Sequence, residues 1–418
     1  MSRNTVLTGM KEMAAGAAPS ARVRAPGARR RSSARHTPCE TTSPPILTSQ
    51  PQSSRSIEVR RSLVLNPLAK GLARRLVVYA AATATSWSVY GLLFQSPLAT
   101  TPSWDGQHFI AIAAHGYPTV IRNYSRIAFF PGLPLLIRFA HLFTGSWDLA
   151  AFTVSVVSGA VFVLAASEIV NRRYGARTAE RAAVLLSVAP GAFLYGLAYS
   201  DVVALAFASL VLLTLSSVNP WRFMLAGFLG TCATLASPLF AIPVCLVILA
   251  ETFRQTRKVT QSLLTTAIAG MGAVDYLAYA GALTGRWDAW WVAEKAWGQG
   301  LNFSNPIMYL HPRASFSLIP ATECVTFVLV LVGYAAMVCE RVPYTWYLYT
   351  APMIFLGMFD GGNWLNPRIL LDAFPLLLAV AVKARGKWFV PICIVSIALM
   401  QAGLVLYTWR WANYIAQP

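Results

Sequence analysis

A run of long apolar segments between Leu76 and Trp409 constrains this 418-residue chain more than any other feature of its sequence. Each segment approaches the roughly 20 residues that a helix needs to cross a bilayer, and short polar stretches separate them. Hydrophobic residues make up 56% of the chain and charged residues only 12%, a balance that water-soluble domains do not carry. We therefore predict an all-α, polytopic membrane protein of about 11 transmembrane helices. The expected spans are residues 76–96, 147–169, 181–200, 202–218, 222–236, 238–252, 262–283, 316–338, 343–359, 369–382 and 388–409.

The net charge of +18 is concentrated at the N-terminus. Residues 1–75 contain about 14 of the 34 basic residues, and no aromatic residue occurs before Tyr79 to stack on a base. The charge therefore indicates membrane topology, and we expect no nucleic-acid partner. The segment also lacks apolar periodicity, so we predict a disordered basic cytoplasmic tail over residues 1–75 and one transmembrane domain over residues 76–418. An organelle transit peptide, or a start codon assigned too far upstream, would produce a similar composition.

The Lys and Arg residues alternate between loops in the way that the positive-inside rule requires. If the tail is cytoplasmic, the inner loops contain Arg172, Arg173, Arg177, Arg181, Arg222, Arg254, Arg257, Lys258, Arg341, Lys383, Arg385 and Lys387. The outer loops instead collect the acidic residues Asp105, Asp148, Asp201, Asp288, Glu294 and Asp360. This alternation requires that residues 127–143 do not cross the membrane, because a full crossing would move every later loop to the other side. Pro131 and Pro134 favour an interfacial or re-entrant segment, since prolines remove donors that lipid cannot replace.

The first expected outer loop contains the segment Trp104-Asp105-Gly106-Gln107-His108-Phe109, which brings an acid and an imidazole just outside the first span. The chain has no Walker loop and no GxGxxG, GxSxG or HExxH motif. The chemistry that the sequence still indicates is therefore that of acidic residues at the outer face. Asp105 and His108 share one face if the segment is helical. The carboxylate would then accept a proton from a hydroxyl, while the imidazole binds an anion or orients the acid. Alternatively Asp105, together with Ser103, caps an interfacial helix.

Two further ionisable sites lie at the expected outer ends of spans. Asp201 faces the same side as Asp105 in this topology, and a charged residue at the edge of an apolar segment is by default a functional candidate. An ordinary turn between two spans is the alternative. Arg368 and Asp372 are four residues apart and predict either a structural ion pair or a guanidinium that binds the phosphate of a lipid-linked substrate. Glu168, Asp275 and Glu323 lie in or near spans, and we assign them no role.

Five segments occur in order along the chain: WDGQHFIAIAAHGY (104–117), AFFPGLPLLIR (128–138), LYGLAYSDVVALAF (194–207), KAWG (295–298) and PRILLDAFPLLL (367–378). In this order they resemble the PIG-V family of membrane mannosyltransferases, and the resemblance extends from about Leu76 to the C-terminus. The chain departs from the usual pattern of that family at several positions, which bear on the identity of the substrate more than on the type of reaction. These positions are Ser103, Gly132-Leu133, Asp201 and Ser237-Pro238.

The resemblance implies a GT-C-class glycosyltransferase, a multi-spanning enzyme that takes its sugar from a polyprenyl phosphate and carries an essential acid in its first outer loop. Asp105 occupies that position and is the expected catalytic base. The expected reaction moves a mannosyl or other hexosyl group to a lipid-linked or glycan acceptor with inversion. We expect Arg368 and His108 to stabilise the departing phosphate, and Trp104 and Asp201 to bind substrate as well. Nothing in the sequence requires a metal ion or cofactor, although two outer carboxylates could hold a metal ion by oxygen ligation.

The resemblance also implies a multi-pass membrane protein with its active site on the non-cytoplasmic side, in the plasma membrane of a bacterium or the endoplasmic reticulum of a eukaryote. Its partners would be a polyprenyl-phosphate-mannose donor, a lipid or glycan acceptor and membrane lipids. A transporter or flippase of lipid-linked sugars would share the span count, but its ionisable residues should lie near the bilayer midplane. A catalytically inactive membrane subunit would share the fold as well.

Overall fold

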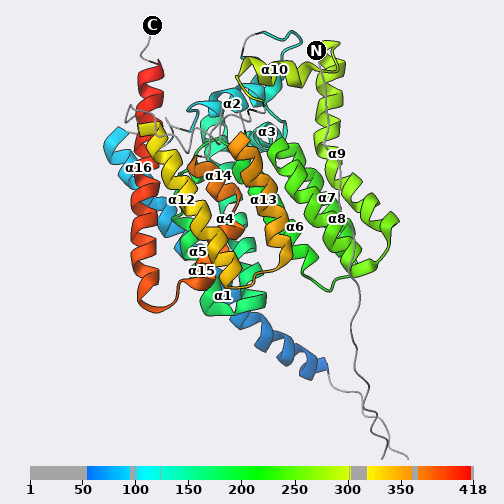
Figure 1. Ribbon diagram of the computed structural model, residues 1–418, viewed down its shortest axis with the longest axis vertical. Coiled ribbons are helices and arrows are strands. Elements are labelled where there is room, and N and C mark those ends of the chain that lie inside the picture. Colours follow the sequence, from blue (N-terminus) through cyan, green and yellow to red (C-terminus); the bar gives the residue numbers. More distant parts are fainter. Residues whose placement is uncertain are drawn as a thin grey trace, which may run out of the picture. The chain divides into compact units, whose positions relative to one another are not determined.

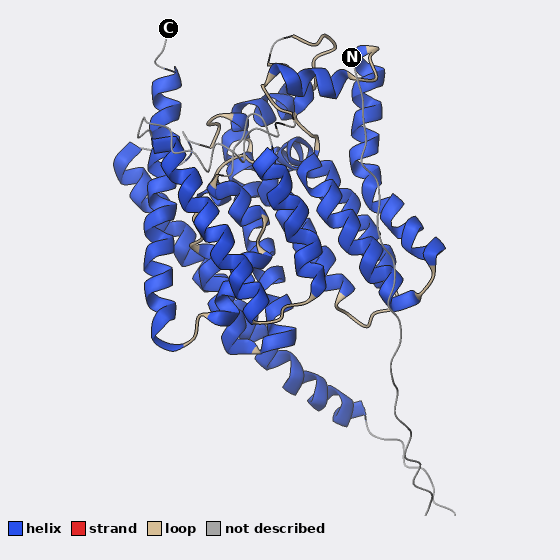
Figure 2. Ribbon diagram, viewed as in Figure 1, coloured by secondary structure: helices blue, strands red, loops and turns tan. Residues whose placement is uncertain are grey.

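All secondary structure in the described part of the chain is helical (Figure 2), which confirms the prediction of an all-α chain. The computed structural model describes residues 54–94, 98, 101–122, 124–300, 302, 318–359 and 366–415. Most of the long helices run along one common direction (Figure 1), and they enclose a buried apolar core. The helices are α1 (Ser54–Phe94), α2 (Asp105–His115), α3 (Gly132–Thr144), α4 (Trp147–Tyr174), α5 (Ala176–Ser187), α6 (Ser200–Leu215), α7 (Arg222–Ala236), α8 (Ala241–Thr256), α9 (Val259–Thr284), α10 (Ala289–Ala296), α12 (Leu318–Cys339), α13 (Tyr344–Phe359), α14 (Pro367–Asp372), α15 (Pro375–Lys383) and α16 (Phe389–Ile415).

Five of the described helices are long and apolar enough to cross a membrane, judged by length and composition. Helices α6 and α7 are also apolar but contain 16 and 15 residues, which at 1.5 Å per residue reach only about 22–24 Å of the roughly 30 Å of hydrocarbon. The structure therefore supports a polytopic membrane protein and does not confirm the expected count of about 11 spanning helices. The five long segments are Trp147–Tyr174, Pro238–Thr256, Val259–Thr284, Thr322–Cys339 and Gly386–Trp409.

The expectation of a continuous span over residues 181–200 is wrong. Helix α5 ends at Ser187, and residues 188–199 follow a buried path that includes only a short 3-10 helix. Gly191 permits this path, because a Cβ there would stand 2.6 Å from the carbonyl oxygen of Pro367. Irregular backbone at membrane depth is tolerated where protein surrounds it and satisfies its polar groups. Two such hydrogen bonds run from Ser155 to the Leu197 carbonyl oxygen and from Thr101 to that of Gly196.

The expected span over residues 369–382 is also broken. Helix α14 ends at Asp372 and α15 begins at Pro375, whose ring cannot donate a helical hydrogen bond. The close approach of Gly191 to Pro367 means that the two broken segments meet inside the fold. Arg368 is therefore carried by a short helix of six residues, held by the irregular segment beside it.

Polar contacts join the loops that are predicted to be cytoplasmic, and these loops lie at one end of the bundle. Arg181 donates at 2.7 Å to a carbonyl oxygen between α15 and α16, where Arg385 lies 3.5 Å from Glu340 of the α12–α13 connection. Arg172, near the end of α4, donates at 3.1 Å to Ser216, which follows α6. Figure 1 shows the α15–α16 turn at the opposite end of the bundle from α2, α3 and α10. The alternation of charge along the sequence therefore matches the two ends of the fold.

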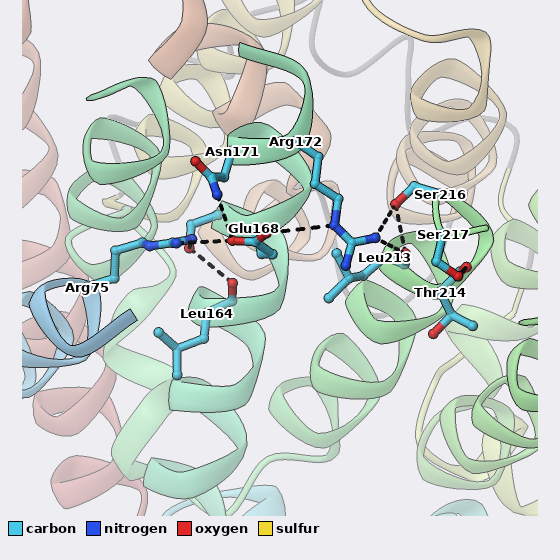
Figure 3. A network of polar contacts seen from close by, with 10 residues as sticks. Arg75, Leu164, Glu168, Asn171, Arg172, Leu213, Thr214, Ser216 and Ser217 are labelled. Atoms are coloured by element: carbon cyan, nitrogen blue, oxygen red, sulfur yellow. Dashed lines mark hydrogen bonds and ion pairs between the residues drawn. The ribbon is translucent and has the colours of Figure 1, made fainter. Parts of the chain in front are cut away.

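Glu168 ties α1 and α6 to α4 near this end (Figure 3). Its carboxylate lies 3.0 Å from the guanidinium of Arg75 on α1 and 3.7 Å from that of Arg172, which reaches on to α6. Arg75, at the boundary expected between the tail and the transmembrane domain, is only 3% exposed and belongs to α1, which begins at Ser54. The sequence around residue 75 could not reveal this packing, because the partner is 93 positions away. Residues 1–53 of the expected tail lie outside the described residues.

The segment that should not cross the membrane contains α3, a helix of 13 residues. At 1.5 Å per residue it is about 20 Å long, too short for the hydrocarbon core. Leu133 and Ile137 are fully buried against the bundle, whereas Leu142 and Phe143 are 74% and 77% exposed. Exposed apolar side chains on a short helix fit a location in the membrane interface, as the charge alternation requires.

Candidate active site

Helix α2 begins with a sharp change of chain direction at Trp104. The φ of Trp104 is 52°, a backbone conformation that costs a non-glycine residue on the order of 1–3 kcal/mol. Gly106 permits the turn, because a Cβ there would stand 2.5 Å from the carbonyl oxygen of Thr101. Asp105 is the first residue of the helix, where the helix dipole favours negative charge. Trp104 precedes the helix and no side chain caps it, so capping by Asp105 or Ser103 does not occur.

Arg368 lies between two acids that come from distant parts of the chain. Its Nη1 is 3.8 Å from Oδ2 of Asp105, and its Nε is 3.5 Å from Oδ1 of Asp201. Within the described residues it makes no ion pair with Asp372, so the pair expected between neighbours on α14 does not form. The fold instead joins α2, α6 and α14 through three residues that the sequence singled out separately.

The negative charge at this site is partly neutralised within the protein, because one guanidinium lies against two carboxylates. The guanidinium of Arg368 occupies the position between the Asp105 and Asp201 carboxylates in which a cation would be attracted most strongly. Among the described residues, no group of three or more His, Cys, Asp or Glu side chains has an arrangement that holds a metal ion.

The carboxyl group of Asp105 is desolvated but still reachable. Burial raises the pKa of Asp105 from its ordinary value, the Arg368 guanidinium lowers it, the Asp201 carboxylate raises it, and the result is about 6. The side chain nevertheless remains 35% exposed. A carboxyl with this pKa is ionised at neutral pH and holds a proton more tightly than an ordinary aspartate, which suits a general base.

Asp201 is much less accessible than Asp105. Its side chain is 3% exposed, whereas the side chain of Arg368 beside it is 22% exposed. The carboxylate of Asp201 therefore contacts Arg368 on its buried side, and a substrate that enters from the exposed side would reach the guanidinium first. In the structure Asp201 contacts Arg368, and the binding of substrate expected of Asp201 from the sequence stays a prediction.

Aromatic residues that directly precede α2 and α6, and one from α16, lie around this charge cluster. The indole nitrogen of Trp104 donates to the Tyr407 carbonyl oxygen at 3.2 Å, and the Tyr407 hydroxyl forms a hydrogen bond with that of Tyr199. The guanidinium carbon of Arg368 is 5.7 Å from the centre of the Tyr199 ring, a cation–π distance. Trp104, expected to bind substrate, thus also fastens the turn before α2 to α16.

His108 lies one turn along α2 and faces an aromatic cluster. Its ring stacks on Phe129 at 5.1 Å and meets the ring of Trp297 edge-on at 5.0 Å. Burial, and to a smaller extent Arg126, lowers the pKa of His108 to about 4, so the ring is neutral at physiological pH. A neutral imidazole does not attract phosphate by charge. Its Nδ1 is buried without a hydrogen-bond partner in the described part of the chain.

The tryptophan-rich stretch after α9 packs on the segment between α2 and α3. The indole nitrogens of Trp290 and Trp297 donate to the carbonyl oxygens of Ala128 and Ser125 at 3.2 and 3.1 Å. These contacts join the stretch after α9 to the segment between α2 and α3, with α10 and α2 at the same end of the bundle in Figure 1. Trp287 is instead 81% exposed. Residues 301 and 303–317, between α10 and α12, lie outside the described residues.

The sequence profile of the family described as mannosyltransferase (PIG-V) matches residues 52–279, more than half of the chain. The chain belongs to the PIG-V mannosyltransferase family. This assignment confirms the resemblance seen in the sequence. The match contains Asp105 and Asp201 and ends before α14, which carries Arg368. A comparison with curated protein sequences finds no match.

Solved oligosaccharyltransferases resemble the fold of this PIG-V family member. The Archaeoglobus fulgidus enzyme in complex with zinc and sulfate is 14% identical, with a TM-score of 0.43 over 79% of this chain and 53% of that chain. The enzyme AglB of the same organism, with an inhibitory peptide and a dolichol-phosphate, is 13% identical, with a TM-score of 0.47 over 79% and 56%. The chain thus spans about half the length of these proteins.

Sequence reasoning missed three residues at this site. Tyr199 stands two positions before Asp201 in a segment that had already been singled out, so the sequence could have indicated it as a site residue. Tyr407 comes from the last helix, and no local pattern singles it out. Asp372 was considered only as a partner of Arg368, yet it is fully buried behind Asp201.

Proposed function

We propose that this PIG-V protein transfers a mannosyl group from a polyprenyl-phosphate-mannose donor to a hydroxyl group of a lipid-linked or glycan acceptor. The transfer takes place at the non-cytoplasmic face and inverts the configuration at the anomeric carbon. The observation that carries the proposal is the pairing of Asp105 with Arg368 at 3.8 Å, with both side chains partly exposed. This pair supplies a proton acceptor and a phosphate-binding cation side by side.

Asp105 acts as the general base. The oxygen of the acceptor hydroxyl attacks the anomeric carbon of mannose, and its proton moves to the Asp105 carboxylate. The bond between that carbon and the phosphate oxygen breaks, and polyprenyl phosphate leaves with the electron pair. Burial supports this role, because it raises the pKa of Asp105 to about 6 and so strengthens the base without protonating it at neutral pH.

Arg368 couples the two halves of the reaction. Before transfer, its positive charge is shared between Asp105 and Asp201. When Asp105 takes the proton it loses its negative charge, and the leaving phosphate gains charge at the same moment. The guanidinium then stabilises the phosphate, whose oxygens match its planar fork of donors. Asp201 keeps Arg368 in position throughout this exchange.

Two neighbouring groups would orient the sugar and acceptor. Trp104 directly precedes Asp105 at the start of α2, and His108, whose Nδ1 has no partner in the described part of the chain, follows one turn later. A neutral imidazole nitrogen accepts or donates one hydrogen bond, which suits a sugar hydroxyl better than a phosphate. The basic loops at the other end of the bundle support the outward orientation of this site, because positive loops stay in the cytoplasm.

Radiolabelled polyprenyl-phosphate mannose tests the proposal. Membranes that contain the protein should move label to a lipid or glycan acceptor, and Asp105→Asn should reduce the initial rate by roughly two to four powers of ten. Asp148→Asn is the matched control, an exposed acid at the same end of the bundle, and should transfer normally. Rates are normalised to folded protein. Transfer by Asp105→Asn at the control rate would contradict the proposal, and movement of intact donor across the bilayer without transfer would indicate a flippase.

A further inference from the structure

Asp372 has the most unusual surroundings of any acid in the described part of the chain. It ends α14 one helical turn after Arg368, and its side chain is fully buried. Neither of its carboxylate oxygens has a hydrogen-bond donor as partner among the described residues. A buried ionised carboxylate without donors is strongly disfavoured, because water would otherwise supply several hydrogen bonds.

Arg368 attracts this acid electrostatically but makes no direct ion pair with it. Its ion pairs are with Asp105 and Asp201, at 3.8 and 3.5 Å, although Asp372 lies at the favourable spacing of four residues on the same helix. If all three acids were ionised, the cluster would hold two more negative charges than positive charges. Such an imbalance in a buried site retains a proton on one of the acids.

The geometry indicates which acid retains it. Asp105 is partly exposed and Asp201 is paired with Arg368, whereas Asp372 has no cation within ion-pair distance in the described residues. The carboxyl groups of Asp372 and Asp201 lie within hydrogen-bonding reach of each other. Two carboxyl groups can bond to each other only if one of them carries a proton. Tyr349 of α13 also interacts with Asp372, and it adds no charge.

We propose that Asp372 is a neutral carboxylic acid at neutral pH and donates a hydrogen bond to Asp201. It is a positioning residue, because it acts on the site through Asp201 and Arg368 and has no exposed surface with which to touch a substrate. A neutral Asp372 leaves the guanidinium of Arg368 to Asp105 and Asp201, the two acids with which it forms ion pairs. An ionised Asp372 would compete for the guanidinium and leave Asp105 without its cation.

Infrared difference spectroscopy on the full-length protein tests the protonation directly. The spectrum of the wild type minus that of Asp372→Asn, recorded at about pH 8 where Asp105 is ionised, should contain the carbonyl band of a protonated carboxylic acid. In the matched difference for Asp148→Asn, only the bands of an ionised carboxylate should be lost. A carboxylate signature for Asp372 would overturn the proposal.

A second measurement avoids dependence on the folding of the variant. In wild-type protein that contains ¹³C-labelled aspartate, a carboxylic acid band that shifts with the label should persist at about pH 8. The absence of any such band would overturn the proposal even if Asp372→Asn failed to accumulate.

The kinetic test rests on the proposed function, whereas the two infrared tests do not. Asparagine supplies the same hydrogen bond to Asp201, so Asp372→Asn should transfer mannose within about threefold of the wild-type rate. Asp372→Ala removes the donor and should lose about tenfold or more. A folded Asp372→Asn variant that is as slow as Asp372→Ala would overturn the positioning role. If the wild type itself transfers nothing, the proposed function fails and the infrared result stands by itself.

Discussion

The rate of transfer should fall about tenfold between pH 7 and pH 5, because Asp105 must be ionised to accept the proton. Burial raises the pKa of this carboxyl to about 6 in spite of Arg368. About nine-tenths of the Asp105 carboxyl groups are then ionised one pH unit above the pKa, and about one-tenth are ionised one pH unit below it. An aspartate of ordinary pKa would stay ionised through this range. The proposed donor is a phosphodiester, which also stays ionised, so it adds no pH dependence of its own.

The assay is the initial rate of mannosyl transfer at low donor concentration, measured across this pH range for three forms of the protein. The wild type defines the acidic limb of the pH–rate profile, the range in which the rate falls as the pH is lowered. Arg368→Met removes the charge that lowers the pKa of Asp105, so the limb should move to higher pH. Arg368→Lys is the matched control, because it keeps a positive charge and should keep the limb near its wild-type position.

Two outcomes would refute this reasoning. One is a wild-type rate that stays constant from pH 7 to pH 5, and the other is a limb that does not move in Arg368→Met. Protonation of Asp105 does not lower the transfer rate by unfolding the protein. The pKa of this group is higher in the folded chain than its ordinary value, so protonation favours the folded state and acidification removes no stability at this residue.

Two further predictions concern the fold. Glu168→Ala leaves the guanidinium of Arg75, which is 3% exposed, without its carboxylate and should cost about 3–5 kcal/mol, whereas Arg74→Ala breaks an exposed ion pair and should cost at most about 1 kcal/mol. Equal losses of thermal stability in detergent would contradict the buried role of this pair. Cysteines substituted for Arg177 and Asp288, in a chain without its native cysteines, should react with membrane-impermeant reagents from the cytoplasmic and outer sides respectively. Reaction of both from one side would overturn the topology.

The sequence by itself determined that the chain is helical and lies in a membrane, and it located most of the helices. Hydropathy is a property of contiguous residues, so the apolar stretches that became α4, α9, α12 and α16 could be recognised without any knowledge of their neighbours. Charge in the loops is equally local. The alternation of basic loops could therefore be read directly, and contacts such as that of Arg385 with Glu340 now join those loops at one end.

The breaks within helices needed the tertiary structure, although their local signals were present. Pro190-Gly191 and Pro375 are visible in the sequence, but an apolar segment that contains them reads as a span. Whether such backbone stays helical depends on what surrounds it. The close contact of Gly191 with Pro367 and the hydrogen bonds to the irregular segment come from distant elements, so hydropathy alone could not reveal them.

The candidate site shows the same division. The sequence singled out Asp105, Asp201 and Arg368 one at a time, since each lies at the end of an apolar segment. Only the packing of α2, α6 and α14 decided that they meet, and that Arg368 pairs with two distant acids in preference to Asp372 four positions away. Spacing along a helix shows which partner is near, but burial and the balance of charge in three dimensions decide which partner is chosen.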